Sequence, residues 1–199
     1  MSQNESESTP GDAVQIVVWD GLIRLFHWTL VFGILSAYLS AKYRLEQLHI
    51  LIGYILAWLL LLRIVWGFCG SRYARYSSFL FAPKETLQYL RSMLSGTPRH
   101  YLGHNPAGAI MVFALLILLT LLYLTGFLTL ASIDFGGPMT SLINPVNDQT
   151  SYFFRHLHGW LVNAGMGLVV IHLLGVISGS FQHRENLVRA MITGKKNSD

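Results

Sequence analysis

The chain has 199 residues, and 52% of them are hydrophobic while only 12% are charged. A soluble globular domain carries about 25% charged residues, so the composition excludes a disordered chain, a coiled coil and an ordinary soluble enzyme. The net charge is +4, but the basic residues are scattered among apolar runs, which indicates membrane topology and not a nucleic-acid-binding surface. The only cysteine, Cys69, excludes an intrachain disulfide. The sequence therefore predicts a polytopic membrane protein.

The first residues, 1–18, begin with the polar and mildly acidic string MSQNESESTPGD. A secretory signal peptide needs a basic segment before its apolar core, and this segment has none. We therefore expect 1–18 to form a disordered tail, followed by one membrane domain over 19–196.

Four long apolar stretches follow, and each is long enough for a membrane-spanning helix, which needs about 20 mainly apolar residues. The first two carry one arginine each, Arg24 and Arg63, both close to an expected helix end where a long side chain can reach the interface. The last two have no charged residue in their central parts. The fold class is therefore all-α, a four-helix transmembrane bundle with spans at about 21–41, 47–69, 107–132 and 154–181.

The distribution of lysine and arginine predicts the orientation, because cytoplasmic loops are enriched in them. The connection between the second and third spans and the C-terminal tail hold most of these residues, namely Arg72, Arg75, Lys84, Arg91, Arg99, Arg184, Arg189, Lys195 and Lys196. The other two connections hold only Lys42, Arg44 and Arg155. We expect both termini and the middle loop to be cytoplasmic in a bacterial inner membrane.

The middle loop contains a further helical pattern. Pro83 marks a helix start and Gly96 follows a helix end, while Leu87, Leu90 and Leu94 share one face. The pattern predicts a short amphipathic helix on the cytoplasmic membrane surface, which closes the bundle or, as the less favoured alternative, docks a partner.

Histidines carry the chemical signal, because ionisable groups inside a span are costly and indicate function. His158 and His172 lie fourteen residues apart on the last span, about 21 Å along the helix axis and within about 40° of the same face. His156 points about 160° away from His172, which favours His158 over its neighbour. One helix thus presents two imidazoles to the bundle interior, one near each membrane surface.

Each of these two histidines needs a partner at its own depth. The first span runs outward with His27 near its start, and the second runs inward with His49 near its start. The sequence therefore predicts two pairs, His49 with His158 near the outer surface and His27 with His172 near the inner surface. Two imidazoles that bridge helices of a bundle are a way to hold a non-covalent haem, so we expect two b-type haems with these four histidines as iron ligands.

Three arginines are candidates for the haem propionates. Arg24 and Arg155 each precede a proposed ligand by three residues, and Arg63 follows His49 by fourteen residues at the depth of the inner haem. Interfacial snorkelling explains each arginine equally well. His100 and His104, before the third span, are weaker candidates for a ligand role, and His183, after the last span, for a quinone or proton-transfer role.

Several strings of the chain resemble the prokaryotic cytochrome b561 family, which shares its domain with the b-type cytochrome subunits of nickel–iron hydrogenases. The matching strings are VWDGLIRLFHW (18–28), LHILIGYILAWLLLLRIVWGFCGSRYARYSSF (48–79), GHNPAGA (103–109), HGWLVNAGMGLVVIH (158–172) and HRENLVRAMITGKK (183–196). The resemblance implies four helices, two b haems and transmembrane or quinone-linked electron transfer. It places the haem ligands on the same four histidines.

The sequence thus predicts a diheme b-type cytochrome that carries electrons between the quinone pool and a redox partner. The expected partners are membrane lipid, ubiquinone or menaquinone, a periplasmic c-type cytochrome or oxidoreductase subunit, and a second copy of the chain in a homodimer. The compact chain has no additional domain, which favours a cytochrome that is independent of a hydrogenase.

Two alternatives stay open, and with them the question of whether the protein is an enzyme. One is a superoxide:quinone oxidoreductase, an activity of the same family, with Lys42, Arg44 and Arg155 as a cationic pocket at the outer haem. The other is a membrane-anchor subunit of a hydrogenase-like complex. A metal-ion transporter is disfavoured because the expected spans contain no carboxylates.

Overall fold

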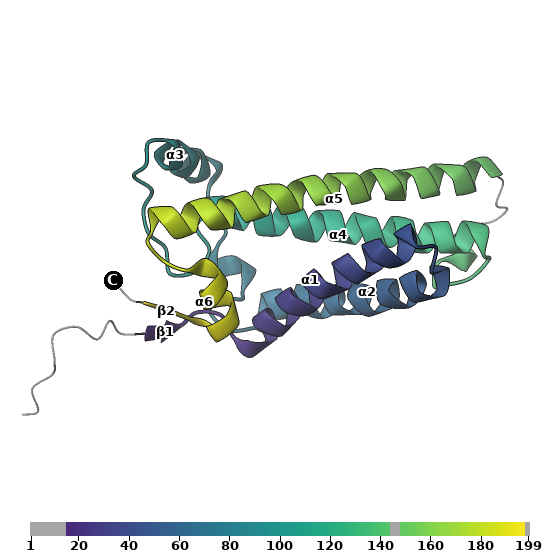
Figure 1. Cartoon of the computed structure of the whole chain (residues 1–199), viewed down its shortest axis with the longest axis horizontal. Helices are drawn as coiled ribbons and strands as arrows, with labels where there is room; N and C mark the ends of the chain where they lie inside the picture. The colour runs from purple at the N-terminus through teal and green to yellow at the C-terminus, as the bar shows by residue number, and fades with distance from the viewer. Residues whose placement is uncertain (1–14, 144–147, 198–199) are drawn as a thin grey trace, which may run out of the picture.

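The computed structural model describes residues 15–143 and 148–197 (Figure 1). Helices dominate this part of the chain, and the only sheet that it contains has two short strands. The elements in chain order are β1 (Gln15–Val17), α1 (Gly21–Lys42), α2 (Glu46–Cys69), η1 (Tyr76–Ser78), α3 (Pro83–Leu94), α4 (Pro106–Ile133), η2 (Thr140–Leu142), α5 (Asp148–Gln182), α6 (Leu187–Thr193) and β2 (Lys195–Asn197).

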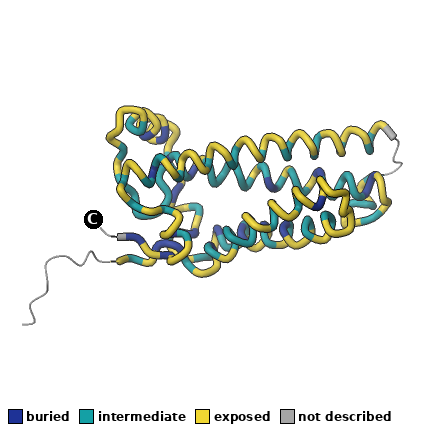
Figure 2. Tube along the Cα trace, in the orientation of Figure 1, coloured by how far each residue is buried: buried dark blue, intermediate teal, exposed yellow. Residues whose placement is uncertain are grey.

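Four helices, α1, α2, α4 and α5, are long and apolar enough to cross a membrane. Most of their side chains lie on the outside of the bundle, where exposed residues dominate in Figure 2. Large apolar side chains are among them, such as Trp58 (62% exposed), Phe68 (73%) and Trp160 (73%). Such a surface is unstable in water and suits contact with lipid. The predicted four-helix membrane fold is confirmed.

The four long helices form two antiparallel hairpins, in which α1 packs along α2 and α4 packs along α5 (Figure 1). Gly33 allows the first hairpin to close tightly, because a Cβ at this position would lie 2.5 Å from Leu56 Cδ2. The α1–α2 and α4–α5 connections lie at one end of the bundle, called here the hairpin end. Both ends of the described chain, α3 and α6 lie at the other, called here the terminal end.

Helix α5 differs from the prediction at its start. It begins at Asp148, six residues before the expected position, and extends for 35 residues. Such a helix is about 52 Å long, well beyond the hydrocarbon thickness of about 30 Å. Hydropathy marks only the part of a helix that crosses the membrane, so it could not predict that the polar first turns of α5 are helical.

The terminal end carries a small cap that corrects the predicted tail boundary. Residues 1–14 lie outside the described residues, but 15–17 form β1, which pairs antiparallel with β2. Val18 and Trp19 are buried against Ala74 and Ala190. Residues 15–18 therefore belong to the folded part of the chain, whereas the sequence predicts a tail over 1–18.

Gly194 makes this cap possible, because it ends α6 in the left-handed region with φ +81° and its carbonyl accepts hydrogen bonds from Val18 N and Trp19 N. A Cβ at position 194 would lie 2.5 Å from the Trp19 carbonyl oxygen. Only glycine meets both demands without strain.

Helix α3 is the predicted short helix of the middle loop. Its buried residues are Thr86 and Tyr89, and it packs on α4. The three leucines of the predicted apolar face, Leu87, Leu90 and Leu94, are exposed. An exposed leucine face fits a helix on the membrane surface, and that location stays a prediction.

Two N-caps fix the starts of α1 and α4. Asn105 accepts a hydrogen bond from Gly108 N, and Pro106 occupies the first turn, which explains the NPAG part of the GHNPAGA string. Asp20 accepts from Ile23 N in α1 and also from Trp66 Nε1 and Ser71 Oγ. Burial raises the pKa of Asp20, but these hydrogen bonds outweigh it and hold the pKa below its usual value.

Candidate haem sites

Two histidine pairs lie inside the bundle, one near each end. His49 of α2 and His158 of α5 form the hairpin-end pair, with ring centroids 6.4 Å apart. His27 of α1 and His172 of α5 form the terminal-end pair, with ring centroids 6.5 Å apart. The structure therefore brings together the same residues that the depth argument pairs.

The ring separation suits one metal ion between each pair. A metal–imidazole nitrogen bond is about 2 Å long, so two imidazoles on opposite sides of one ion have ring centres about 6 Å apart. Both observed separations match this distance. Imidazoles that hydrogen-bonded directly to each other would lie closer together.

The hairpin-end histidines are held in a defined tautomer by neighbouring helices. His49 Nδ1 donates to the Ala37 carbonyl oxygen of α1 at 2.9 Å, and His158 Nδ1 donates to the Leu122 carbonyl oxygen of α4 at 3.1 Å. A carbonyl only accepts, so Nδ1 carries the proton on both rings. Nε2 keeps its lone pair, which is the form of histidine that binds a metal.

Three further residues support this pair, and sequence reasoning did not find them. Ser40 is buried beside His49, and its hydroxyl donates to the same Ala37 carbonyl at 2.8 Å. Thr125 Oγ1 lies 3.2 Å from His158 Nδ1. Gly126 leaves room for the ring, because a Cβ there would lie 3.3 Å from His158 Cε1. The sequence feature that could have identified Thr125 and Gly126 is a threonine followed by a glycine inside an otherwise apolar span.

The terminal-end pair has different surroundings. His27 Nδ1 is buried without a hydrogen-bond partner among the described residues. The His27 ring packs edge-on against Trp28, with centroids 5.2 Å apart. The Trp28 indole donates to the Met191 carbonyl at 3.3 Å, which links this pair to α6.

The other histidines lie apart from the two pairs. His156 is exposed and stacks on Tyr152 with centroids 4.0 Å apart, as the choice of His158 over His156 requires. His100 and His183 lie together at the terminal end, with ring centroids 5.2 Å apart. His100 Nε2 also lies 3.6 Å from Glu185 Oε2.

His104 is packed between aromatic rings at the terminal end, with centroids 4.7 Å from Trp19 and 4.5 Å from Phe79. Burial, with the nearby charges of Arg63 and Lys196, lowers the pKa of His104 to about 3. The imidazole is therefore neutral at physiological pH and acts as a packing group. Its Nδ1 is buried without a hydrogen-bond partner among the described residues.

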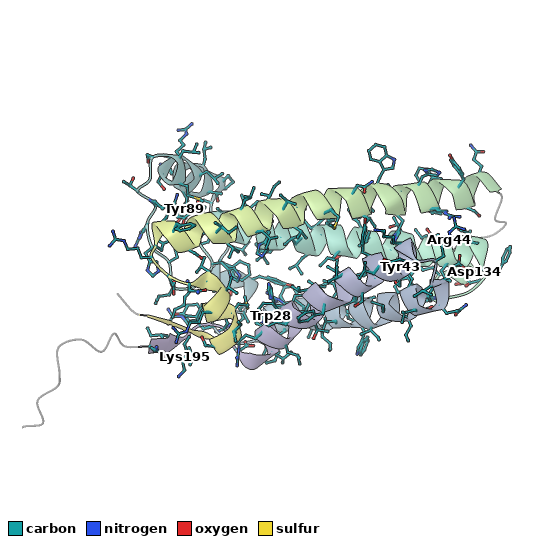
Figure 3. The ribbon with its side chains drawn as sticks, in the orientation of Figure 1. Trp28, Tyr43, Arg44, Tyr89, Asp134 and Lys195 are labelled. Atoms are coloured by element: carbon teal, nitrogen blue, oxygen red, sulfur yellow. The ribbon has the colours of Figure 1, made fainter. Side chains whose placement is uncertain are left out.

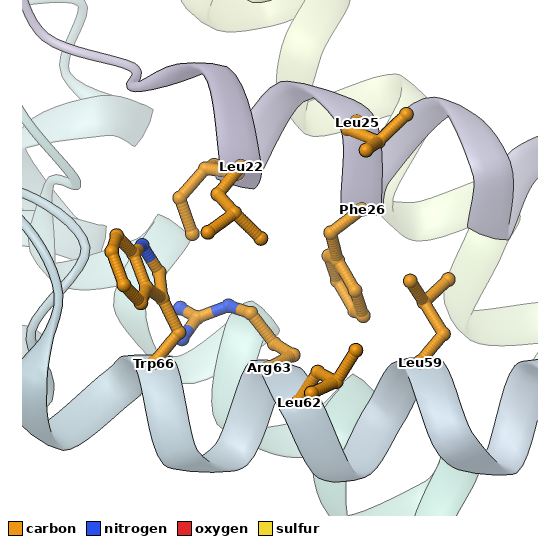
Figure 4. A pocket seen from close by; sticks show the side chains of 8 residues that line it. Leu22, Leu25, Phe26, Leu59, Leu62, Arg63 and Trp66 are labelled. Atoms are coloured by element: carbon orange, nitrogen blue, oxygen red, sulfur yellow. The ribbon is translucent and has the colours of Figure 1, made fainter.

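Arg63 is the buried cation of the second span. It is 6% exposed, its Nη2 donates to the Ala74 carbonyl at 3.4 Å, and its Cζ lies 5.2 Å from the Tyr76 ring centroid. Its Nη1 is buried without a hydrogen-bond partner among the described residues. A small cavity of about 80 Å³ between α1 and α2 is lined by Arg63, Trp66 and apolar side chains (Figure 4). That volume admits a few water molecules and no haem.

The other two predicted arginines differ in their partners. Arg24 Nη1 donates to the Ile192 carbonyl at 2.6 Å, so Arg24 ties the start of α1 to α6, and its Nε is buried and unpaired within the described chain. Arg155 is exposed on α5 near the hairpin end. Tyr43, Arg44 and Asp134 also lie at the hairpin end, whereas Lys195 lies at the terminal end (Figure 3).

The donor set of each pair fits a b-type haem. Within the described residues, no three His, Cys, Asp or Glu side chains converge as a metal-ion cage would require. Two imidazoles at this separation would hold a haem iron, with the porphyrin supplying the remaining ligands. The orphaned Nη1 of Arg63 and Nε of Arg24 are donors of the kind that a haem carboxylate accepts from.

Comparisons with known proteins agree with this chemistry. The family described as "Prokaryotic cytochrome b561" matches residues 18–194. Three relatives bear the name "Probable Ni/Fe-hydrogenase B-type cytochrome subunit". They come from Rhizobium leguminosarum bv. viciae (25% identical, covering 91% of this chain and 88% of the relative), Bradyrhizobium diazoefficiens (24%, 91% and 85%) and Cupriavidus necator (25%, 89% and 85%).

Proposed function

The chain belongs to the prokaryotic cytochrome b561 family, and we propose that it is a diheme member that relays electrons between the quinone pool and a redox partner. A b-type cytochrome of this family binds haem and functions in electron transfer. One observation carries the diheme proposal: two histidines face each other near each end of the bundle, with ring separations of 6.4 and 6.5 Å.

Two histidines would hold each haem iron, His49 and His158 at the hairpin end and His27 and His172 at the terminal end. Bound haem supplies one-electron redox chemistry at its iron. Two histidines at each haem iron disfavour a role in binding oxygen at the metal. Helix α5 contributes to both pairs and is continuous between them, which fixes the axial spacing of the two sites at about 21 Å.

Arginines at the two ends are candidates for the haem carboxylates. We assign Arg63 and Arg24 to the terminal-end haem, because each has a buried guanidinium nitrogen that lacks a partner within the described chain. We assign Arg155, which is exposed, to the hairpin-end haem. A buried cation is stabilised by an ionised partner, so a propionate would satisfy Arg63.

The arrangement of charges supports an orientation for the relay. The terminal end holds both ends of the described chain and the arginine-rich middle loop, so we place it in the cytoplasm and the hairpin end outside. The histidine pairs would then form a path from one side of the inner membrane to the other.

The partner class follows from the relatives. They are named as nickel–iron hydrogenase cytochrome subunits, and this chain spans 85–88% of the three relatives above, so its compactness does not set it apart from them. We therefore favour a membrane-bound oxidoreductase complex, such as a hydrogenase, as the donor or acceptor opposite the quinone.

Reconstituted vesicles test the relay. Protein in sealed liposomes with trapped ferricyanide would pass electrons from a membrane-impermeant reductant outside to the acceptor inside. His158→Ala would reduce the rate to that of empty vesicles, while His156→Ala would retain it. Reduction of the haem bands by added quinol tests the quinone link. A relay rate equal to that of empty vesicles for the unmodified protein would overturn the proposal.

A further inference from the structure

The hairpin-end pair has the same support on both of its rings. Each Nδ1 donates to a helix carbonyl, and the residue three positions after that carbonyl is a buried hydroxyl residue, Ser40 after Ala37 and Thr125 after Leu122. Two different helices, α1 and α4, supply the two supports. Both ligands of one site are therefore held by hydrogen bonds that terminate on backbone carbonyls.

Thr125 makes the stronger contact of the two hydroxyls. Its Oγ1 donates to the Leu121 carbonyl at 2.8 Å, which commits the hydroxyl proton to the helix. The Thr125 oxygen and the Leu122 carbonyl then share the single His158 Nδ1–H proton, at 3.2 and 3.1 Å. Hydrogen bonds in such a chain polarise one another. The Ser40 hydroxyl lies farther from its histidine, at 3.5 Å from His49 Nδ1.

The terminal-end pair has no equivalent support among the described residues. His27 Nδ1 is buried and unpaired there, and no hydrogen bond from the His172 ring is found. Two arginines with buried guanidinium nitrogens, Arg24 and Arg63, lie toward this end of the bundle. A positive charge close to a haem favours the reduced iron, which carries one positive charge fewer.

We propose that Thr125 is a positioning residue that, together with the Leu122 and Ala37 carbonyls, sets the reduction potential of the hairpin-end haem below that of the terminal-end haem. This inference rests on the proposed function, because it needs both haems. An Nδ1–H donor makes an imidazole a more basic ligand, and a more basic ligand stabilises ferric iron. Electron transfer from the hairpin end to the terminal end would then be downhill.

The ring planes allow the two haems to be told apart. The imidazoles of the hairpin-end pair are nearly perpendicular, at 87°, whereas those of the terminal-end pair are at 55°. Perpendicular ligand planes act equally on the two iron d orbitals that bond with the imidazoles and leave them nearly equal in energy. Nearly equal orbitals give a low-spin ferric haem its most anisotropic EPR signal, which therefore marks the hairpin-end site.

A potentiometric titration followed by EPR and optical spectra tests the proposal in the unmodified protein. The more anisotropic signal is expected to disappear at the lower potential. Disappearance at the higher potential would overturn the proposed order without any variant. A protein with fewer than two haems would instead refute the proposed diheme function, so the two failures are distinguishable.

Variants at Thr125 test the residue itself. Thr125→Val removes the acceptor with little change in volume and should shift only the lower potential, upward. Thr125→Ser retains the hydroxyl and should restore the original value. Thr120→Val is the matched control, because the Thr120 hydroxyl also donates to a helix carbonyl, at 2.8 Å from Leu116 O, and has no histidine contact. Unchanged potentials in Thr125→Val with two haems bound would overturn the role of Thr125.

Discussion

The hairpin-end pair and the terminal-end pair each consist of two histidines, but their surroundings differ. The hairpin-end rings are bound through Nδ1 to the backbone of adjacent helices, so their support comes from the spans alone. The terminal-end rings lie beneath a cap built from β1, α6 and β2, and His27 Nδ1 has no partner in the described chain. One fold thus places two pairs of the same residue type, histidine, in different surroundings.

A larger residue at position 126 should disrupt haem binding at the hairpin end and leave the terminal end intact. A Cβ at 126 would already lie 3.3 Å from His158 Cε1, and valine adds two methyl groups beyond it. Overpacking costs about 1–3 kcal/mol, which corresponds to about 5- to 150-fold weaker haem binding. We expect Gly126→Val to lose the hairpin-end haem and to retain the terminal-end haem, measured as haem per chain.

Gly159→Val is the matched control, because a Cβ at 159 would meet no atom within 4 Å. Full haem content and an unchanged EPR spectrum in Gly126→Val would contradict the role given to Gly126.

A substitution in the cap at the terminal end should lower stability mainly at that end. Gly194→Ala places a side chain at φ +81°, 2.5 Å from the Trp19 carbonyl oxygen. The left-handed conformation alone costs about 1–2 kcal/mol for a residue with a Cβ. Thermal unfolding followed by haem absorbance should show the terminal-end haem released at a lower temperature, with the hairpin-end haem less affected.

Gly96→Ala separates the cost of the positive φ from the cost of the contact with Trp19. Gly96 has φ +75°, and no atom lies within 4 Å of a Cβ added there. It should lower stability less than Gly194→Ala does. Equal effects of the two substitutions would show that the contact with Trp19 is unimportant.

The smallest expected effect concerns Asp20, which joins α1 to Trp66 and Ser71 at the terminal end. Its pKa is lowered in the folded protein, so its carboxylate stabilises the fold at pH values above the unfolded value, about 3.9. That contribution is lost as the pH falls through the folded-state pKa. We expect Asp20→Asn to cost about 0.3–1 kcal/mol at pH 7.

The pH dependence supplies the check on this prediction. The difference in unfolding temperature between Asp20→Asn and the unmodified protein should shrink toward zero in acid. A difference that persists unchanged as the pH falls through the folded-state pKa of Asp20 would mean that the charge of Asp20 is not its cause.

The sequence predicted the spans and the histidine pairs for a clear physical reason. Hydropathy marks a membrane helix directly, and depth along four antiparallel helices leaves only one way to pair four histidines. The pairing of β1 with β2 joins segments about 180 residues apart and leaves no local pattern. The carbonyls of Ala37 and Leu122 were equally invisible, because any residue at those positions has a carbonyl.

Haem content tests the central claim most directly. Haem per chain and the dithionite-reduced minus oxidised spectrum would be measured for the purified protein, His158→Ala and His156→Ala. We predict about two haems per chain in the unmodified protein and in His156→Ala, and about one in His158→Ala. A single haem in the unmodified protein, or equal loss in both variants, would contradict the two-pair account.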